Sequence, residues 1–248
     1  MEADITARTE DPVVPRRTRL RQQLIRDAKA AAREIAAADG LDGLSLTAVA
    51  HRVGVSPPAL YRYFDGRQGL VRALYDDLTA DLIAEVAAAF HRQDPDDRSA
   101  QLHAGIRAIL TWSLANPAGF SLLMGDAHPS AAAAEAGIPE VLARELGGAF
   151  GELFLSLIRD GVLRYPEDDR IEPVLRSQLT VYQQAVKPDL PLGAVLVMLT
   201  CWRQVYGTVG LAVSRHLAFA FPSIDAFFEH MIGDILTLVG LTRSPNLR

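Results

Sequence analysis

The spacing of apolar residues is the feature that most restricts the fold of this chain. Across its 248 residues, apolar side chains recur at intervals of three and four positions, and no segment alternates apolar with polar residues. The first spacing is that of an amphipathic α-helix, and the second would be that of a half-buried strand. Alanine and leucine together outnumber the β-branched residues, and both favour helix. The sequence therefore predicts an all-α protein.

Capping and turn residues divide this pattern into separate helices. Gly40 and Gly54 are expected to end helices, and Pro57 suits the first position of one. The predicted helices cover residues 20–39, 46–53, 57–64, 67–91, 99–115, 117–125, 140–160, 171–186, 190–216 and 223–240. Residues 126–139 are expected to form a loop with some helix.

Charge is distributed unevenly along the chain. The formal net charge is −5, which by itself does not suggest nucleic acid. Residues 16–72 nevertheless carry 11 basic and five acidic side chains, whereas residues 73–248 carry 13 basic and 21 acidic ones. A basic block next to an acidic remainder suggests two tasks, of which the first is contact with a polyanion. A chance fluctuation in solvated faces remains the alternative at this point.

Residues 45–64 read as a helix, a tight turn and a second helix. Ser45 is the expected N-cap of the first helix, and Ala50 is small where two helices would cross. Gly54 can adopt the positive φ that the turn requires, Val55 would fill the turn, and Ser56 would cap the second helix. The segment is therefore predicted to be a helix-turn-helix whose second helix enters the DNA major groove.

These residues carry a family resemblance. The segment 26–78 resembles the TetR family of one-component transcriptional regulators, and residues 116–125 and 202–210 resemble, more weakly, one subgroup of its C-terminal domains. The matching residues are Ala31, Ala32, Ile35, Gly40, Ser45, Leu46, Thr47, Ala50, Val53, Gly54, Val55, Ser56, Leu60, Tyr61, Arg62, Tyr63, Phe64, Arg67, Leu70 and Leu74. The resemblance implies a three-helix DNA-binding domain joined by a long helix to a larger helical domain for ligand binding and dimerisation. We expect a flexible tail over residues 1–18, the first domain over 19–80 and the second over 81–243.

The resemblance also implies which residues contact DNA. They are Thr47, Ser56, Pro57, Ala59, Leu60, Tyr61, Arg62, Tyr63 and Arg67. Arg67 occupies the place of a family lysine that meets phosphate, and an arginine there keeps the charge. The recognition helix offers no Asn, Gln or Lys, so base readout is expected to depend on Arg62, apolar contacts and DNA shape. Phe64 is expected in the core, and at least one of Tyr61 and Tyr63 on the surface.

Large side chains gather in the C-terminal part of the sequence. Their simplest role is in the core, but the resemblance implies that some line a ligand cavity between helices. The residues expected there are Trp112, Met124, Phe154, Trp202 and Tyr206. Because ionisable groups are few within these apolar runs, the expected ligand is a small, mostly apolar inducer that releases the protein from DNA.

The remaining expectations concern partners and chemistry. The sequence has no catalytic acid–base, nucleophile or metal-ligand spacing and no phosphate-binding loop, so neither enzyme activity nor a cofactor is expected. We predict a homodimer formed by helices 190–216 and 223–240, bound to a palindromic double-stranded DNA operator. No membrane span is expected, and the single Cys201 excludes an intramolecular disulfide and favours the cytoplasm. An all-α enzyme and a non-specific DNA-packaging protein remain the alternatives.

Overall fold

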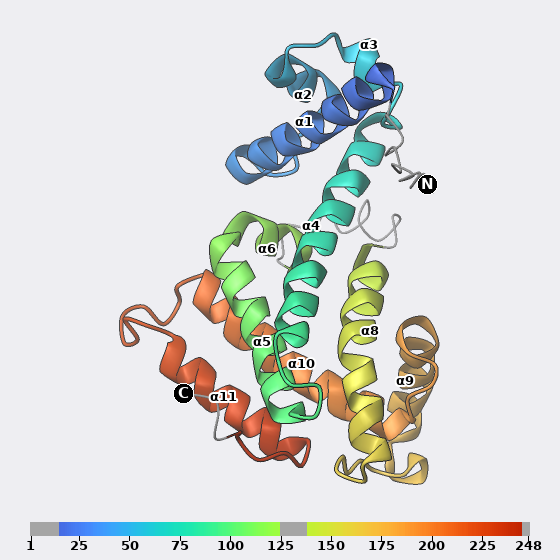
Figure 1. Cartoon of the computed structure of the whole chain (residues 1–248), viewed down its shortest axis with the longest axis vertical. Coiled ribbons are helices and arrows are strands. Elements are labelled where there is room, and N and C mark those ends of the chain that lie inside the picture. The colour runs from blue at the N-terminus through green and yellow to red at the C-terminus, as the bar shows by residue number, and fades with distance from the viewer. Residues whose placement is uncertain (1–14, 125–137, 245–248) are drawn as a thin grey trace, which may run out of the picture. The chain divides into compact units, whose positions relative to one another are not determined.

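The computed structural model describes residues 15–124 and 138–244. Within these ranges it contains ten α-helices, one short 3-10 helix and no strand (Figure 1). The predicted all-α fold is therefore confirmed. Contacts divide the chain into two compact units between Ala73 and Leu74, and each unit has its own buried core.

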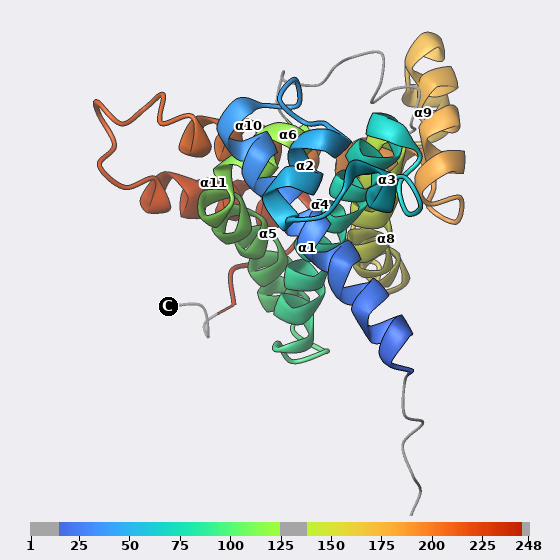
Figure 2. The ribbon, with the colours of Figure 1, turned by 90° about the horizontal axis from the view of Figure 1, so that it is seen from above.

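The first unit is built from three helices and the beginning of a fourth. They are α1 (Arg16–Asp39), α2 (Leu46–Val53), α3 (Pro57–Leu60) and the first turns of α4 (Gly66–His91), and Figure 2 shows the first three grouped together. Small residues of α1 allow α2 to approach closely, and α1 and α2 are in contact. The core residues are Ala28, Ala32 and Ile35 of α1, Val49 and Ala50 of α2, Leu60, Phe64 and Leu70.

Two helix boundaries in this unit differ from the prediction. Helix α1 begins at Arg16 rather than at residue 20, because the backbone N–H groups of Thr18 and Arg19 already bond to the carbonyl of Pro15. The predicted tail therefore ends at least three residues earlier, and its residues 1–14 lie outside the described residues. Helix α3 ends at Leu60, whose carbonyl accepts the N–H groups of both Tyr63 and Phe64. The chain continues beyond α3 in hydrogen-bonded turns instead of helix.

The second unit contains the rest of α4 and six further α-helices. These are α5 (Arg98–Ala115), α6 (Pro117–Met124), α8 (Ile138–Arg159), α9 (Pro173–Val186), α10 (Leu192–Val213) and α11 (Asp225–Leu238), with a 3-10 turn at Asp168–Arg170. All six helices were predicted from the sequence, and the predicted ends differ from the observed ones by a few residues at most. Helix α10 contacts α5, α9 and α11, and α8 contacts α5 and α9 (Figure 1). The predicted loop 126–139 lies almost entirely outside the described residues.

Two glycines set the spacing of helices in this unit. A Cβ atom at Gly147 of α8 would lie 2.0 Å from Cγ1 of Val186 on α9, and one at Gly105 of α5 would lie 2.5 Å from the ring of Phe90 on α4. Real Cβ atoms do not approach that closely, so each glycine permits a close contact that alanine would prevent. These contacts bring α9 against α8 and α4 against α5.

Helix α10 is the one described helix that is long and apolar enough to cross a membrane by length and composition alone. Its most apolar 18-residue window is 56% buried inside the structure. Buried core helices of soluble proteins meet the same two criteria, and α10 contacts three other helices.

Candidate functional site

The first candidate site is the helix-turn-helix of the first unit. Ser45 has an extended backbone, and its Oγ accepts the N–H of Ala48 at 3.1 Å, which caps α2 as predicted. Gly54 follows α2 with φ of 78°, in the left-handed region, and Val55 N–H bonds to the Ala50 carbonyl at 2.9 Å. These two bonded ends fix where α2 starts and where the chain turns towards α3.

Most of the predicted DNA-contact residues lie at the surface of this motif. Tyr61 is 60% exposed, Thr47, Ser56 and Arg62 are exposed, and Pro57, Ala59 and Tyr63 are half-buried. Phe64 is buried, so the expected division between Phe64 in the core and at least one tyrosine at the surface is confirmed. Arg67 is exposed as well, so the exposed set combines two cations, one phenol and two hydroxyl groups.

Two residues of the predicted set behave differently. Leu60 has no exposed surface, and burial of a leucine side chain stabilises the fold. Its side chain cannot reach a base, and we remove it from the contact set. Ser56 occupies the N-cap of α3, but its side chain makes no capping hydrogen bond. Its hydroxyl therefore remains exposed.

Arg67 at the start of α4 has a structural role that the sequence did not reveal. Its Nε donates to the carbonyl of Leu44 at 3.0 Å, and its Nη2 donates to the carbonyl of Leu41 at 2.6 Å. These two bonds hold the segment that leads into α2. Arg67 is nevertheless exposed, and a guanidinium has five N–H donors, so donors remain for a phosphate.

The basic start of α1 lies beside the recognition segment. The guanidinium of Arg21 lies over the ring of Tyr63, with 5.4 Å between its carbon and the ring centroid. Arg16, Arg17 and Arg19 are exposed on the first turns of the same helix. The first turns of α1 therefore carry exposed positive charge, and Arg21 brings one of these charges to Tyr63.

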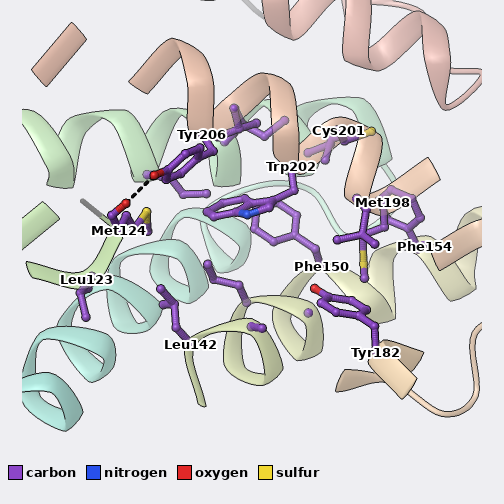
Figure 3. Close-up of a pocket in the computed structure, with 18 residues that line it drawn as sticks. Leu123, Met124, Leu142, Phe150, Phe154, Tyr182, Met198, Cys201, Trp202 and Tyr206 are labelled. Carbon is purple, nitrogen blue, oxygen red and sulfur yellow. Dashed lines mark hydrogen bonds between the residues drawn. The ribbon is translucent and has the colours of Figure 1, made fainter. Parts of the chain in front are cut away.

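The second candidate site is a cavity of about 410 Å³ in the second unit. Its walls come from α5, α6, α8, α9 and α10 (Figure 3). Leu102, Ile106 and Ile109 of α5 face it at helical spacing, opposite Met198, Trp202 and Tyr206 of α10. None of the 18 lining residues carries a charged side chain.

Four of the five predicted pocket residues line this cavity and one does not. Met124, Phe154, Trp202 and Tyr206 are among the lining residues. Trp112 lines a different, more polar cleft of about 460 Å³, together with Arg92 and Asn116. On α5, Trp112 lies roughly a quarter of a turn from the stripe of residues that faces the cavity, so its expected place in the pocket is wrong.

Few polar atoms face the cavity. The Tyr206 hydroxyl donates to the carbonyl of Met124 at the end of α6 (Figure 3). Burial raises the pKa of the Cys201 thiol to about 12 and raises the pKa of Tyr182 above its ordinary value. Both groups are therefore neutral at physiological pH, and the described lining of the cavity is mostly apolar and carries no charge.

The sequence prediction missed Tyr182 and Cys201 as lining residues. Tyr182 lies on α9 with the buried Leu179 and Val186, at spacings of three and four residues. This periodicity was a usable signal for the inner face of α9. Cys201 was expected to be a buried, inert thiol, and it is buried with a raised pKa.

Other chemistry finds little support in the described part of the chain. Within residues 15–124 and 138–244 no group of three or more His, Cys, Asp and Glu side chains is placed to hold a metal ion. His103 contacts both carboxylate oxygens of Glu229, at 3.1 and 2.9 Å, and Arg107 bonds to Asp225 at 2.8 Å. These polar contacts tie α5 to α11.

The sequence matches two known protein families. Residues 30–74 match the family described as bacterial regulatory proteins, tetR family, and residues 102–235 match the family described as tetracyclin repressor-like, C-terminal domain. The HTH-type transcriptional regulator Rv1816 of Mycobacterium tuberculosis strain H37Rv is 30% identical over 177 residues, which is 70% of this chain and 74% of the relative.

Solved structures give the same result. The putative regulatory protein SCO4313 superposes with a TM-score of 0.65 at 26% identity, over 90% of this chain and all of that one. RolR, solved in complex with resorcinol, superposes with a TM-score of 0.53 at 18% identity, over 90% of this chain and 91% of that one, and it shares the fold. The chain belongs to the TetR family of helix-turn-helix, DNA-binding transcriptional regulators, which are not enzymes.

Proposed function

We propose that this protein is a cytoplasmic, dimeric repressor that a small, mostly apolar ligand releases from its operator. The observation that carries the proposal is a cavity of about 410 Å³ whose described lining residues are uncharged. The same chain contains a helix-turn-helix. We further propose residues 19–80 as the DNA-binding domain and residues 81–243 as the ligand-binding and dimerisation domain.

The proposed DNA interface uses the exposed residues of the first unit. Arg62 and Tyr61 are the candidates for base contact, because both are long, exposed side chains directly after α3. The proposed contacts to the backbone and groove walls are Thr47, Ser56, Pro57, Ala59, Tyr63 and Arg67. Arg21 adds positive charge beside Tyr63, and Arg16, Arg17 and Arg19 add exposed positive charge to the same helix, which favours phosphate.

The proposed dimer interface uses the outer faces of α10 and α11. Gly207 and Gly210 on α10 and Gly233 on α11 are mid-helix glycines at which an added Cβ would meet no other atom within 4 Å. A glycine within a helix costs about 1 kcal/mol relative to alanine. Gly148 on α8 has the same open surroundings, but α10 and α11 contact each other and carry three such glycines between them. Close approach of a second copy would explain them, and two-fold pairing would match a palindromic operator.

Helix α4 offers a route for release. It is one continuous helix, Gly66–His91, whose residues belong to both units. A ligand that shifts its second half would also shift the helix end that carries Arg67. To weaken operator binding tenfold, the ligand need favour the released state by only about 1.4 kcal/mol. RolR, which has this fold, was solved with the small aromatic compound resorcinol, and this supports a ligand of similar kind.

The experiment is a selection of bound sequences from a random DNA pool, followed by a ligand screen on the complex. We expect a palindromic consensus and a mass of two chains by light scattering. A monomer at micromolar concentration would exclude the dimer. If no apolar compound loosened the DNA complex, the ligand part of the proposal would be wrong while DNA binding would stand.

A further inference from the structure

Two polar groups face the cavity without a partner. Trp202 has an indole N–H, which can only donate a hydrogen bond, and Tyr182 has a hydroxyl, which can donate or accept. Among the hydrogen bonds of residues 15–124 and 138–244, none involves the side chain of either residue. Figure 3 shows the Tyr182 hydroxyl directed from α9 towards the other lining side chains.

Tyr206, the third lining residue with a polar group on its aromatic ring, already has a hydrogen-bond partner. The hydroxyl of Tyr206 donates to the Met124 carbonyl, so its proton is already in use. The cavity therefore has two unused donors, on α9 and α10, within walls that are otherwise hydrocarbon, aromatic or sulfur. A ligand atom that accepts one of these protons would form a hydrogen bond in largely apolar surroundings, where such a bond is electrostatically stronger than in water.

A charged ligand has no counterpart among the described residues that line this cavity. None of their side chains is that of an acid, an arginine, a lysine or a histidine. Burial keeps Cys201 protonated, with a pKa of about 12, so a thiolate is absent at neutral pH. An ionised ligand would lose its hydration and gain no opposite charge.

The size and walls of the cavity also constrain the ligand. A cavity of about 150 Å³ can hold one benzene ring, so about 410 Å³ has room for two rings. Trp202 and Tyr206 lie with ring centroids 6.2 Å apart at 40°, and Phe150 adds another aromatic face on α8. Aromatic rings pack well against such tilted faces.

We propose that the cavity binds an uncharged ligand of about two rings that carries one hydrogen-bond acceptor of the ketone type, and that Tyr182 and Trp202 donate to it. This inference rests on the proposed function and names the ligand class of the same site. It assigns specificity to two residues, whereas the rest of the wall supplies apolar contact.

The test compares three probes of nearly equal shape on the full-length protein. Benzophenone has two rings and a ketone, diphenylmethane has the same rings without the acceptor, and 4-benzoylbenzoate adds a carboxylate. By titration calorimetry we expect benzophenone to bind about tenfold more tightly than diphenylmethane. The carboxylate is expected not to bind detectably.

Variants assign the preference to the two donors. Tyr182→Phe removes only the hydroxyl and should reduce the ketone preference severalfold, and Trp202→Phe should do the same while keeping a ring. Tyr165→Phe, outside the cavity lining, is the matched control and should keep the full preference. Circular dichroism establishes that each variant is folded.

Several outcomes would overturn the inference. They are equal affinity for benzophenone and diphenylmethane, tightest binding of the carboxylate, no binding of any probe, or an unchanged preference in both variants. DNA release is measured separately, by operator anisotropy. A ketone preference without loss of operator binding would support the ligand class and contradict the proposed release. Release of the operator by diphenylmethane and benzophenone alike would support the proposed release and contradict the ketone preference.

Discussion

The two units of this protein present their functional residues in opposite ways. In the first unit the assigned groups are mostly polar, lie at the surface and are close together in the sequence, between Thr47 and Arg67. In the second unit they are mostly apolar and line a cavity, and five helices between Leu102 and Tyr206 contribute them. A DNA surface is reached from outside and needs charge, whereas an apolar ligand needs walls that exclude water. The difference teaches that short-range sequence signals identify the first kind of site better than the second.

The largest expected effect is the loss of folding stability when Gly193 is replaced, compared with the loss when Gly54 is replaced. At Gly193 a Cβ would lie 2.0 Å from the backbone oxygen of Pro166, and a backbone atom cannot rotate away. Gly193→Ala should therefore lower the free energy of unfolding by about 3 kcal/mol. At Gly54 a Cβ would meet nothing, but φ is 78°, so Gly54→Ala should cost about 1–2 kcal/mol from strain alone.

Urea denaturation of the two variants measures both values. Equal losses would contradict the distinction between a glycine required by its own backbone angle and one required by a neighbouring segment.

The second prediction concerns base contact by the first unit. Arg62→Ala should weaken binding to the selected operator by about 1–3 kcal/mol and relax the sequence preference at one position. Arg164→Ala, an exposed arginine of the acidic second unit, is the control and should leave binding unchanged. Anisotropy on operator and mismatched DNA measures both. If Arg62→Ala weakened all sequences alike, its role would be phosphate contact.

The third prediction concerns the dimer face. Gly207→Val should raise the dimer dissociation constant at least about tenfold, because overpacking a close helix contact costs about 1–3 kcal/mol. Gly148→Val on α8 is the matched control, since a Cβ there also meets nothing within the chain. Sedimentation equilibrium would contradict the proposed interface if Gly207→Val remained as dimeric as the control.

The fourth prediction separates the two roles of Arg67. Arg67→Lys keeps the positive charge but cannot hold the carbonyls of Leu41 and Leu44 together as the planar guanidinium does. We expect a stability loss of about 1 kcal/mol with little change in the salt dependence of DNA binding. Arg67→Ala should in addition reduce that salt slope by about one unit. If the salt slope were unchanged in Arg67→Ala, Arg67 would have only its structural role and would not contact phosphate.

The smallest expected effect is the absence of a pH dependence in ligand binding. Burial raises the pKa of Cys201 to about 12 and raises the pKa of Tyr182 above its ordinary value. Both groups therefore stay protonated at neutral and mildly alkaline pH. The affinity for benzophenone should therefore be constant between about pH 6 and 9. A fall in affinity across that range by calorimetry would show that a charged form of a lining group contributes.

The sequence predicted the first unit well because its signals are local. Ser45, Gly54 and the exposed Tyr61 each follow from neighbours within a few residues. The departures have physical causes too: arginines do not mark a helix start, so α1 begins earlier than expected, and the burial of Leu60 depends on tertiary packing and not on its neighbours in the sequence.

The cavity was less predictable because residue type does not specify which helix face turns inward. Trp112 and Trp202 are chemically identical, yet only Trp202 lines the cavity. The contribution of Tyr182 depends on how closely α9 approaches α8, which Gly147 permits. Helical periodicity indicates the inner face of a helix such as α9, but it does not indicate which distant helix that face meets.

The central claim is that an uncharged ligand in the second unit weakens DNA binding by the first. It is tested most directly by titrating the complex of full-length protein and labelled operator with benzophenone while recording anisotropy. The account predicts that the apparent dissociation constant of the operator rises at least about tenfold at saturation, and that Trp202→Ala binds operator normally but does not respond. Unchanged operator affinity with the cavity saturated, or an unaltered response in Trp202→Ala, would contradict it.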